Sequence, residues 1–174
     1  MKRPLSFIGL FACLTLFFSC ASSPNNNLKT ADHVDLQRYM GKWYEIARYE
    51  HPFQVGCVNS TATYTLLDNG KVEVLNECDN PTKKDGHDKA VGKAWVVDEK
   101  TNSKLKVSFF WPFRGDYWII DLGKNYEYSV VSDPSMEYLW ILSRTPQMPE
   151  TTLAKILDNL QSLGFNLDLL VFNK

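Results

Sequence analysis

The 174-residue sequence has no excess of charge of either sign. It contains 19 lysine and arginine residues against 20 aspartate and glutamate residues, which gives a formal net charge of −1. No basic surface therefore stands out that would attract nucleic acid or an anionic lipid surface at long range. This balance argues against a nucleic acid partner and gives a phosphate-binding role no electrostatic support.

The motifs of common enzymes are also missing. The sequence contains no Gly-x-Ser-x-Gly element, no P-loop and no Gly-x-Gly-x-x-Gly run after a strand. Its histidines, His33, His51 and His87, lack the paired spacing of metal sites, and we interpret each as a surface residue. We therefore predict that the chain is not an enzyme and binds neither metal nor cofactor.

No apolar run is long enough to span a membrane. The longest covers residues 7–18, follows Lys2 and Arg3, and ends at Ser19 and Cys20. A spanning helix needs about 20 apolar residues, so this order of basic, apolar and small residues predicts a cleaved signal peptide over 1–19. The remaining length is typical of one domain.

The end of this run resembles a bacterial lipobox, in which a small residue precedes the cysteine that is diacylated. Ser19 and Cys20 fit that pattern, although Phe17 and Phe18 replace its usual leucine and small residue. We predict that Cys20 is acylated and holds the chain on a membrane. Because Ala21 and not aspartate follows, the resemblance implies the bacterial outer membrane and a periplasm-facing protein. Residues 20–34 are then the acylated N-terminus and a flexible tether, and 35–174 the folded domain.

Short β-rich runs recur about every ten residues from Gly41 onward, separated by turn-forming clusters. Such spacing indicates an all-β sandwich or barrel, and the absence of crossover segments makes the strands antiparallel. The eight runs are approximately 43–50, 57–67, 71–78, 88–98, 104–111, 115–121, 126–132 and 138–144.

Alternation within these runs indicates which face is buried. Leu105, Val107 and Phe109 share one face of their strand, and the small residues Ala90 and Gly92 share one face of another. A closed sheet with small and aromatic residues inside leaves space, and eight-stranded barrels can hold one small ligand. A sandwich filled by its own side chains remains the alternative.

The pattern changes after the last run. Leucine and isoleucine residues fall at helical spacing between Thr151 and Leu163, with Pro149-Glu150 as a start signal and Gly164 as a stop signal. We predict one amphipathic helix packed outside the sheet. Residues 166–172 then form a short final strand.

Two motifs resemble those of the lipocalin family. Gly41-Lys42-Trp43, within 40–48, resembles the G-x-W signature of the first lipocalin strand, and 138–146 is similar to the last-strand motif that ends in arginine. The resemblance covers about residues 35–173 and is closest to the bacterial outer-membrane lipocalins and their apolipoprotein D-like relatives. It implies an eight-stranded antiparallel up-and-down β-barrel with one C-terminal helix outside. The family's middle motif is poorly kept, with Gly123-Lys124-Asn125 in its place.

In such a barrel each strand runs opposite to the next, so the start of one strand lies at the same end of the barrel as the end of its neighbour. The start of the first strand and Arg144 then share one end, where Gly41, Trp43 and Arg144 form a structural closure through a cation–π pair. The opposite end is the ligand mouth, with Phe53, Trp111 and Phe113 at its rim. Arg114 or Lys83 can reach a polar headgroup there.

The leading functional hypothesis is a binding module for a fatty acid, lysophospholipid or similar apolar ligand, acting as a monomer or weak dimer. Two alternatives stay open: a lipid isomerase that uses a lumenal cysteine, and a structural envelope lipoprotein whose barrel is filled. The ligand-lining residues that we predict are Ala62, Tyr64, Val74, Ala94, Val107, Phe109, Trp111, Phe113, Tyr117, Tyr128 and Trp140.

Two thiols remain once the signal is removed and Cys20 is acylated. In an exported compartment Cys57 and Cys78 are expected to pair. Cys57 opens the second predicted strand and Cys78 ends the third, so both lie at one end of a hairpin. Pairing about the turn at 68–70 places Cys57 opposite a residue near position 80, so the disulfide needs a bulge.

Overall fold

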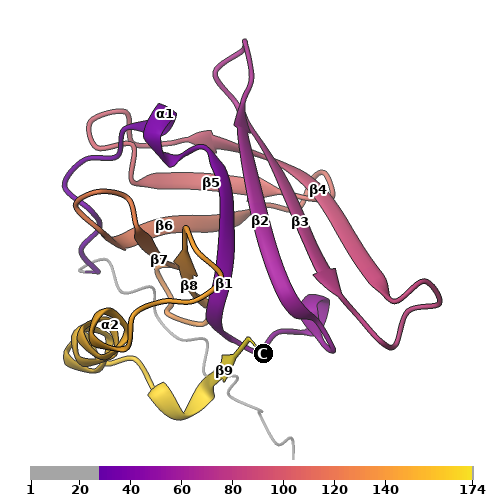
Figure 1. Cartoon of the computed structure of the whole chain (residues 1–174). Coiled ribbons are helices and arrows are strands. Elements are labelled where there is room, and N and C mark those ends of the chain that lie inside the picture. Colours follow the sequence, from indigo (N-terminus) through magenta and orange to yellow (C-terminus); the bar gives the residue numbers. More distant parts are fainter. Residues whose placement is uncertain (1–27, 174) are drawn as a thin grey trace, which may run out of the picture.

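The computed structural model describes residues 28–173, which form a closed antiparallel barrel (Figure 1). The predicted signal peptide, Cys20 and most of the predicted tether lie outside the described residues. Each strand pairs with the next, and β1 pairs with both β8 and β2, which closes the barrel. The strands are β1 (Gly41–Tyr49), β2 (Val58–Leu66), β3 (Val72–Asp79), β4 (His87–Val96), β5 (Lys104–Ser108), β6 (Gly115–Leu122), β7 (Tyr128–Ser132) and β8 (Leu139–Ser143).

The eight predicted strands are confirmed, with shifts at their ends. The largest shift is in β5, which ends at Ser108 and not at residue 111. A final strand, β9 (Leu170–Phe172), pairs with β1 outside the closed barrel. It is shorter than the predicted 166–172 because Leu167–Leu169 forms the 3-10 helix η2.

Two α-helices lie at different places on the barrel. The predicted C-terminal helix is α2 (Glu150–Ser162), and it lies on the outside of the barrel (Figure 1). The short helix α1 (Leu36–Tyr39) was not predicted; Asp35 caps it by accepting from the backbone N–H of Gln37 at 2.9 Å. Within residues 28–173, no helix has the length and apolar character needed to cross a membrane.

Strand alternation divides the buried residues into two clusters. The inner one includes Trp43, Tyr64 and Ala94. It fills the part of the lumen nearest to the start of β1, which we call the lower lumen. The outer one lies between α2 and the barrel wall, where Ile156 and Leu160 pack with outward-facing residues of β1, β7 and β8. The predicted position of the amphipathic helix is therefore confirmed.

Tyr128 requires a correction, because it packs with the outer cluster and not with the lumen. Its hydroxyl donates to Asp121 at 3.3 Å, and Asn159 of α2 donates to the same carboxylate. On β7 the inward positions are instead those of Ser129 and Val131, because adjacent residues of a strand point to opposite faces.

Candidate functional site: the barrel lumen

The lumen is closed at the end where β1 begins. The guanidinium of Arg144 lies 3.8 Å from the centre of the Trp43 ring, and the indole Nε1–H donates to the backbone carbonyl of Tyr39 at 2.9 Å. Gly41 has a φ of +93°, which glycine adopts without strain, and it lies beside Arg144. The predicted cation–π closure is therefore confirmed.

A hydrogen-bonded group of tyrosines lies above this closure. The Tyr117 hydroxyl lies 2.8 Å from that of Tyr39 and 2.9 Å from that of Tyr64, and Tyr39 also bonds to Ser129 at 2.9 Å. Burial raises the pKa of Tyr39 to about 12 and also raises the pKa values of Tyr64 and Tyr117. All three phenols therefore stay protonated, and we call them the tyrosine floor.

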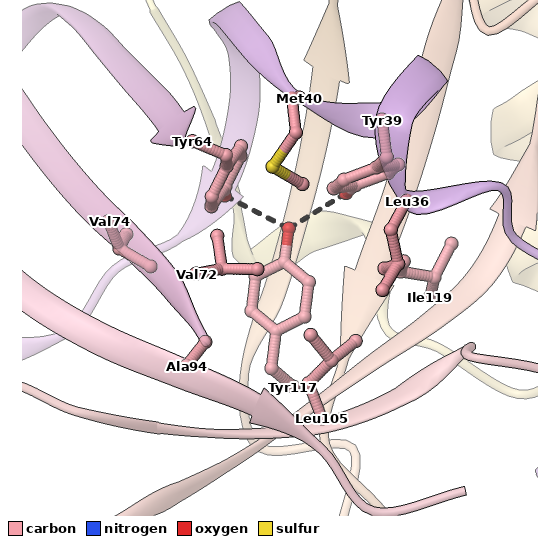
Figure 2. A pocket seen from close by; sticks show the side chains of 10 residues that line it. All are labelled: Leu36, Tyr39, Met40, Tyr64, Val72, Val74, Ala94, Leu105, Tyr117 and Ile119. Atoms are coloured by element: carbon pink, nitrogen blue, oxygen red, sulfur yellow. Dashed lines mark hydrogen bonds between the residues drawn. The ribbon is translucent and has the colours of Figure 1, made fainter. Parts of the chain in front are cut away.

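The lower lumen has little free space. A cavity of about 10 Å³ lies at the tyrosine floor, close to the smallest volume that holds one water molecule. Figure 2 shows the phenol of Tyr117 pointing toward Tyr39 and Tyr64. Four predicted ligand residues line this cavity, namely Tyr64, Val74, Ala94 and Tyr117. A ligand larger than water must therefore lie nearer the open end.

Inward-facing apolar residues continue above the floor. Val107, Phe109 and Trp140 are half-buried and pack against the inner cluster, to which the buried Ala62 belongs. A Cβ added at Gly92 would lie 2.8 Å from Cδ1 of Phe109, so the glycine leaves room for that ring. The predicted positions of these four residues on the inner face are confirmed, whereas contact with a ligand stays a prediction.

A buried ion pair lies further along β1 and was not anticipated. Nη1 of Arg48, whose residue is 2% exposed, donates to the carboxylate of Glu45 at 2.8 Å. Gln54 of the 3-10 helix η1 (Pro52–Gln54) donates to the same carboxylate at 2.7 Å, and Arg48 donates to the Gln54 carbonyl at 3.2 Å. Burial raises the pKa of Glu45, and Arg48 opposes that rise. These contacts hold η1 against lumen-facing side chains of β1.

His51 is a second correction, since it is 5% exposed and not a surface residue. Its ring stacks on Phe53 at 3.9 Å between centroids and lies 5.2 Å from the Trp140 ring. Burial, with a contribution from the positive charge of Arg48, lowers the pKa of His51 to about 4. The imidazole is therefore neutral at pH 7. His33 and His87 are exposed as predicted.

The predicted rim residues are exposed. Trp111 is 79% exposed, and Phe53, Phe110 and Phe113 are similarly open to solvent. Arg114 is exposed, whereas Lys83 forms an ion pair with Asp88 at 3.3 Å. Phe110, Trp111 and Phe113 lie in the segment between β5 and β6, where their exposed rings are available for contact with apolar molecules.

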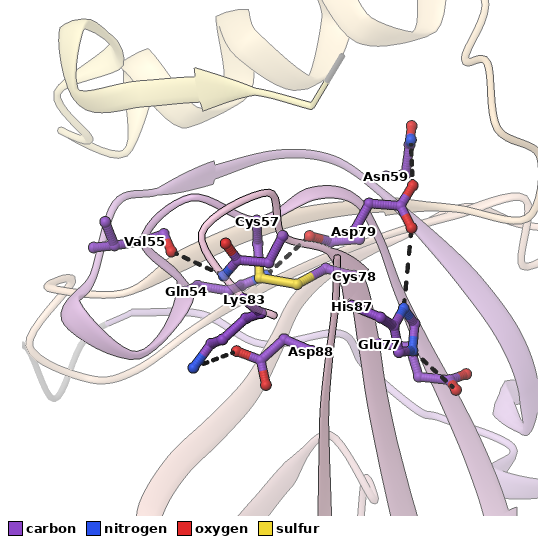
Figure 3. Close-up of a disulfide and its surroundings, with 12 residues drawn as sticks. Gln54, Val55, Cys57, Asn59, Glu77, Cys78, Asp79, Lys83, His87 and Asp88 are labelled. Atoms are coloured by element: carbon purple, nitrogen blue, oxygen red, sulfur yellow. Dashed lines mark hydrogen bonds and ion pairs between the residues drawn. A yellow bond between two sulfur atoms is a disulfide. The ribbon is translucent and has the colours of Figure 1, made fainter. Parts of the chain in front are cut away.

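A disulfide joins the start of β2 to the end of β3 (Figure 3). It connects Cys57 and Cys78, whose Cα atoms are 5.5 Å apart. The β2–β3 register shifts between Val58 and Thr61, and Asn59 in this interval has a φ of 53°. The predicted disulfide and the bulge that it needs are therefore both present.

Among residues 28–173, no group of three or more histidine, cysteine, aspartate or glutamate side chains is arranged to hold a metal ion. His87 lies between Glu77 and Asp79, but these groups are 3.8 and 4.0 Å away and all three are partly exposed (Figure 3). The candidate site is therefore the lumen, with its apolar inner surface and its small number of polar groups.

One family model and several known proteins are similar to this chain over most of its length. A family model described as a lipocalin-like domain matches residues 34–174. Outer membrane lipoprotein Blc of Citrobacter freundii is 36% identical over 173 residues, which cover 99% of this chain and 97% of that protein. Blc of Vibrio cholerae is 39% identical over 166 residues, covering 95% and 96%.

Two further matches are less similar in sequence. Mouse apolipoprotein D is 30% identical over 181 residues, covering 94% of this chain and 92% of that protein. Among solved structures, insecticyanin from the tobacco hornworm Manduca sexta matches with a TM-score of 0.68 and 17% identity, covering 85% of this chain and 84% of that one. The latter likeness concerns the fold alone.

Proposed function

The chain belongs to the lipocalin family, and from this premise we propose that it carries a single-chain lipid in its lumen while anchored to the bacterial outer membrane. The ligand class is a fatty acid, a lysophospholipid or a similar apolar molecule. The observation that carries the proposal is the inward-facing apolar surface of Val107, Phe109 and Trp140 above the tyrosine floor. Ligand pockets are typically apolar surfaces with a few well-placed polar groups.

The position of the ligand follows from the filled lower lumen. Its acyl chain lies along Val107 and Phe109 with the methyl end toward the tyrosine floor, because the cavity below has only about 10 Å³. The headgroup then stays near the rim, within reach of the exposed Arg114. Trp111 and Phe113 at the rim contribute the apolar entrance.

The proposed location rests on the predicted acylation of Cys20 and on the relatives named outer membrane lipoproteins. Tight anchoring needs two acyl chains, since one gives only marginal membrane binding. Anchoring on the periplasmic face places the lumen close to a source of lipid. The alternative of an isomerase with a lumenal thiolate is disfavoured, because both Cys57 and Cys78 are held in the disulfide.

Mass spectrometry of lipid extracted from the purified protein tests the proposal directly. A fluorescent acyl probe should bind the wild type and change its tryptophan emission. Phe109→Asp should abolish this binding, because it places an unpaired carboxylate on the apolar surface. Val91→Asp is the matched control, since Val91 is exposed on a neighbouring strand. Unchanged binding by Phe109→Asp would place the ligand elsewhere, and no bound lipid or probe at all would favour the structural lipoprotein.

A further inference from the structure

The barrel has an outer groove where β1 and β2 separate. Their pairing ends at Tyr44 and Thr61, and from Ala47 onward β1 pairs with β9 along the edge that β2 has left. A groove of about 570 Å³ lies on the outside at this point, and we call it the seam groove. Its lining residues are Lys42, Tyr44, Glu45, Ile46, Asn59, Ser60, Thr61, Pro146, Gln147, Met148, Leu153, Phe172 and Asn173.

The apolar part of the seam groove comes from three separate elements. Ile46 lies on β1, Met148 and Leu153 lie just before and within α2, and Phe172 lies on β9. Ile46, Met148 and Leu153 are half-buried and extend the outer cluster, whereas Phe172 is exposed. This surface can therefore take more apolar contact without any change in the core.

Polar side chains separate the seam groove from the lumen. Glu45 and Ser60 line the groove, and Gln54 donates to both of them, at 2.7 and 3.3 Å respectively. Arg48 balances the charge of Glu45. A ligand in the groove therefore meets polar side chains whose charges balance one another, and its apolar contacts are separate from those of the lumen.

One unbalanced charge lies in the seam groove. The Lys42 ammonium lies 5.4 Å from the centre of the Tyr44 ring, and Lys42 forms no ion pair with any residue of the described range 28–173. Arg48, which contacts the lining residue Glu45, is already neutralised by that carboxylate. An anionic group on the ligand would therefore be attracted to Lys42.

We propose that the seam groove binds a single-chain anionic amphiphile, with its carboxylate or phosphate at Lys42 and its chain across Ile46, Leu153 and Phe172. The groove volume lies within the range of roughly 300–1,000 Å³ that is typical of small-molecule sites. The proposal is independent of the lumenal function, because the two sites share no apolar residue.

Photo-crosslinking tests this proposal on the full chain carrying Cys20→Ser, which removes the predicted acyl anchor and the need for detergent. The probe is dodecanoate with a diazirine near its methyl end, and crosslinked peptides are mapped by mass spectrometry. We expect crosslinks in residues 146–153 and 170–173, besides any in the lumen. Leu153→Glu should remove the groove crosslinks and leave the lumenal ones, and Thr151→Glu, at an exposed position of α2, should leave both.

Loss of the charge at Lys42 separates the headgroup contact from the chain contact. Lys42→Gln should weaken groove crosslinking by dodecanoate about tenfold, as for a lost charge-assisted hydrogen bond, and should leave crosslinking by the matching alcohol unchanged. Phe172→Ser provides a second variant if Leu153→Glu does not fold. Absence of groove crosslinks in the starting protein, or their persistence in a folded Leu153→Glu or Phe172→Ser variant, would overturn the proposal. Phe109→Asp should remove only the lumenal crosslinks, so failure of one site is distinguished from failure of the other.

Discussion

Arg144 holds the closed end of the barrel through a cation–π contact with Trp43 and through hydrogen bonds to nearby backbone carbonyls. Its guanidinium covers the buried Trp43 ring at 3.8 Å and donates to the carbonyls of Arg38 at 2.6 Å, Met40 at 2.9 Å and Lys42 at 3.1 Å. One side chain from the end of β8 therefore fixes the chain on both sides of Met40, between α1 and β1.

Truncating Arg144 should destabilise the barrel without removing ligand binding. Arg144→Ala loses the ring contact and leaves the backbone carbonyls of Arg38, Met40, Lys42 and Tyr126 without this donor. We therefore expect a loss of about 1–3 kcal/mol in the free energy of unfolding. Urea denaturation measures this loss. Arg144→Lys keeps the charge but not the planar, multi-donor geometry, and should be intermediate. Unchanged stability with lost binding would instead make Arg144 a ligand group.

Removing the disulfide should lower stability by about 3 kcal/mol, because the bridge restricts a loop of about twenty residues in the unfolded chain. The double variant Cys57→Ser, Cys78→Ser avoids leaving one free thiol, and thermal unfolding compares it with the wild type. Reduction of the wild type should give the same shift. Two titratable thiols in the denatured, unreduced domain would show that the bridge is not formed.

His51 should make stability fall as the pH falls from about 6.5 toward 4. In the unfolded chain the imidazole takes up a proton near pH 6.5, whereas in the native barrel its pKa is about 4. The unfolded state therefore binds more protons in this window, and stability present at pH 7 is lost with acid. The expected loss is about 3 kcal/mol, since each pKa unit corresponds to about 1.4 kcal/mol.

The matched variant isolates this effect from the titration of carboxyl groups such as Glu45. His51→Phe keeps an aromatic ring beside Phe53 and Trp140, and the difference between wild type and variant should shrink or reverse as the pH falls from 6.5 to 4. His33→Phe changes an exposed histidine and should leave the slope as it is. Parallel stability curves for the wild type and His51→Phe would contradict the prediction.

Acylation of Cys20 should decide where the protein partitions. We expect Cys20→Ser to move the protein from the membrane fraction to the soluble fraction, because the predicted acyl chains provide the anchor. Fractionation followed by immunoblotting measures the change. A Cys20→Ser protein that stays as firmly on the membrane as the wild type would require another anchor.

Most of the barrel could be predicted from local patterns. Alternation, turn clusters and the helical spacing after Pro149 reflect periods of two and 3.6 residues, which are visible in any single stretch of sequence. The pairing of Trp43 with Arg144 followed from family motifs combined with strand counting. The Cys57–Cys78 bridge followed because both cysteines lie near the ends of one hairpin, although the bulge at Asn59 could only be inferred as necessary.

The errors arose where contacts join distant or irregular segments. Arg48 is buried because η1 contacts it, and His51 is buried beside Phe53 and Trp140. η1 is an irregular segment between two strands, and no periodic pattern in the sequence predicts where it packs. Tyr39 lies in the lumen because α1 places it there, and no helix was predicted over residues 36–39. Tyr126 lies before β7 with a φ of 64°, so the alternation does not continue from Tyr126 to Tyr128, and the sequence alone does not fix this boundary.

In the proposed binding mode, the tyrosine floor also limits the length of ligand chain that the lumen can bind. Tyr39, Tyr64 and Tyr117 bind one another and cannot be pushed aside without breaking buried hydrogen bonds. An acyl chain gains about 0.8 kcal/mol for each methylene group that it buries, but only until its methyl end reaches these phenols. Each further carbon must stay outside the rim, so the depth between Phe113 and Tyr117 sets the chain length beyond which affinity no longer increases.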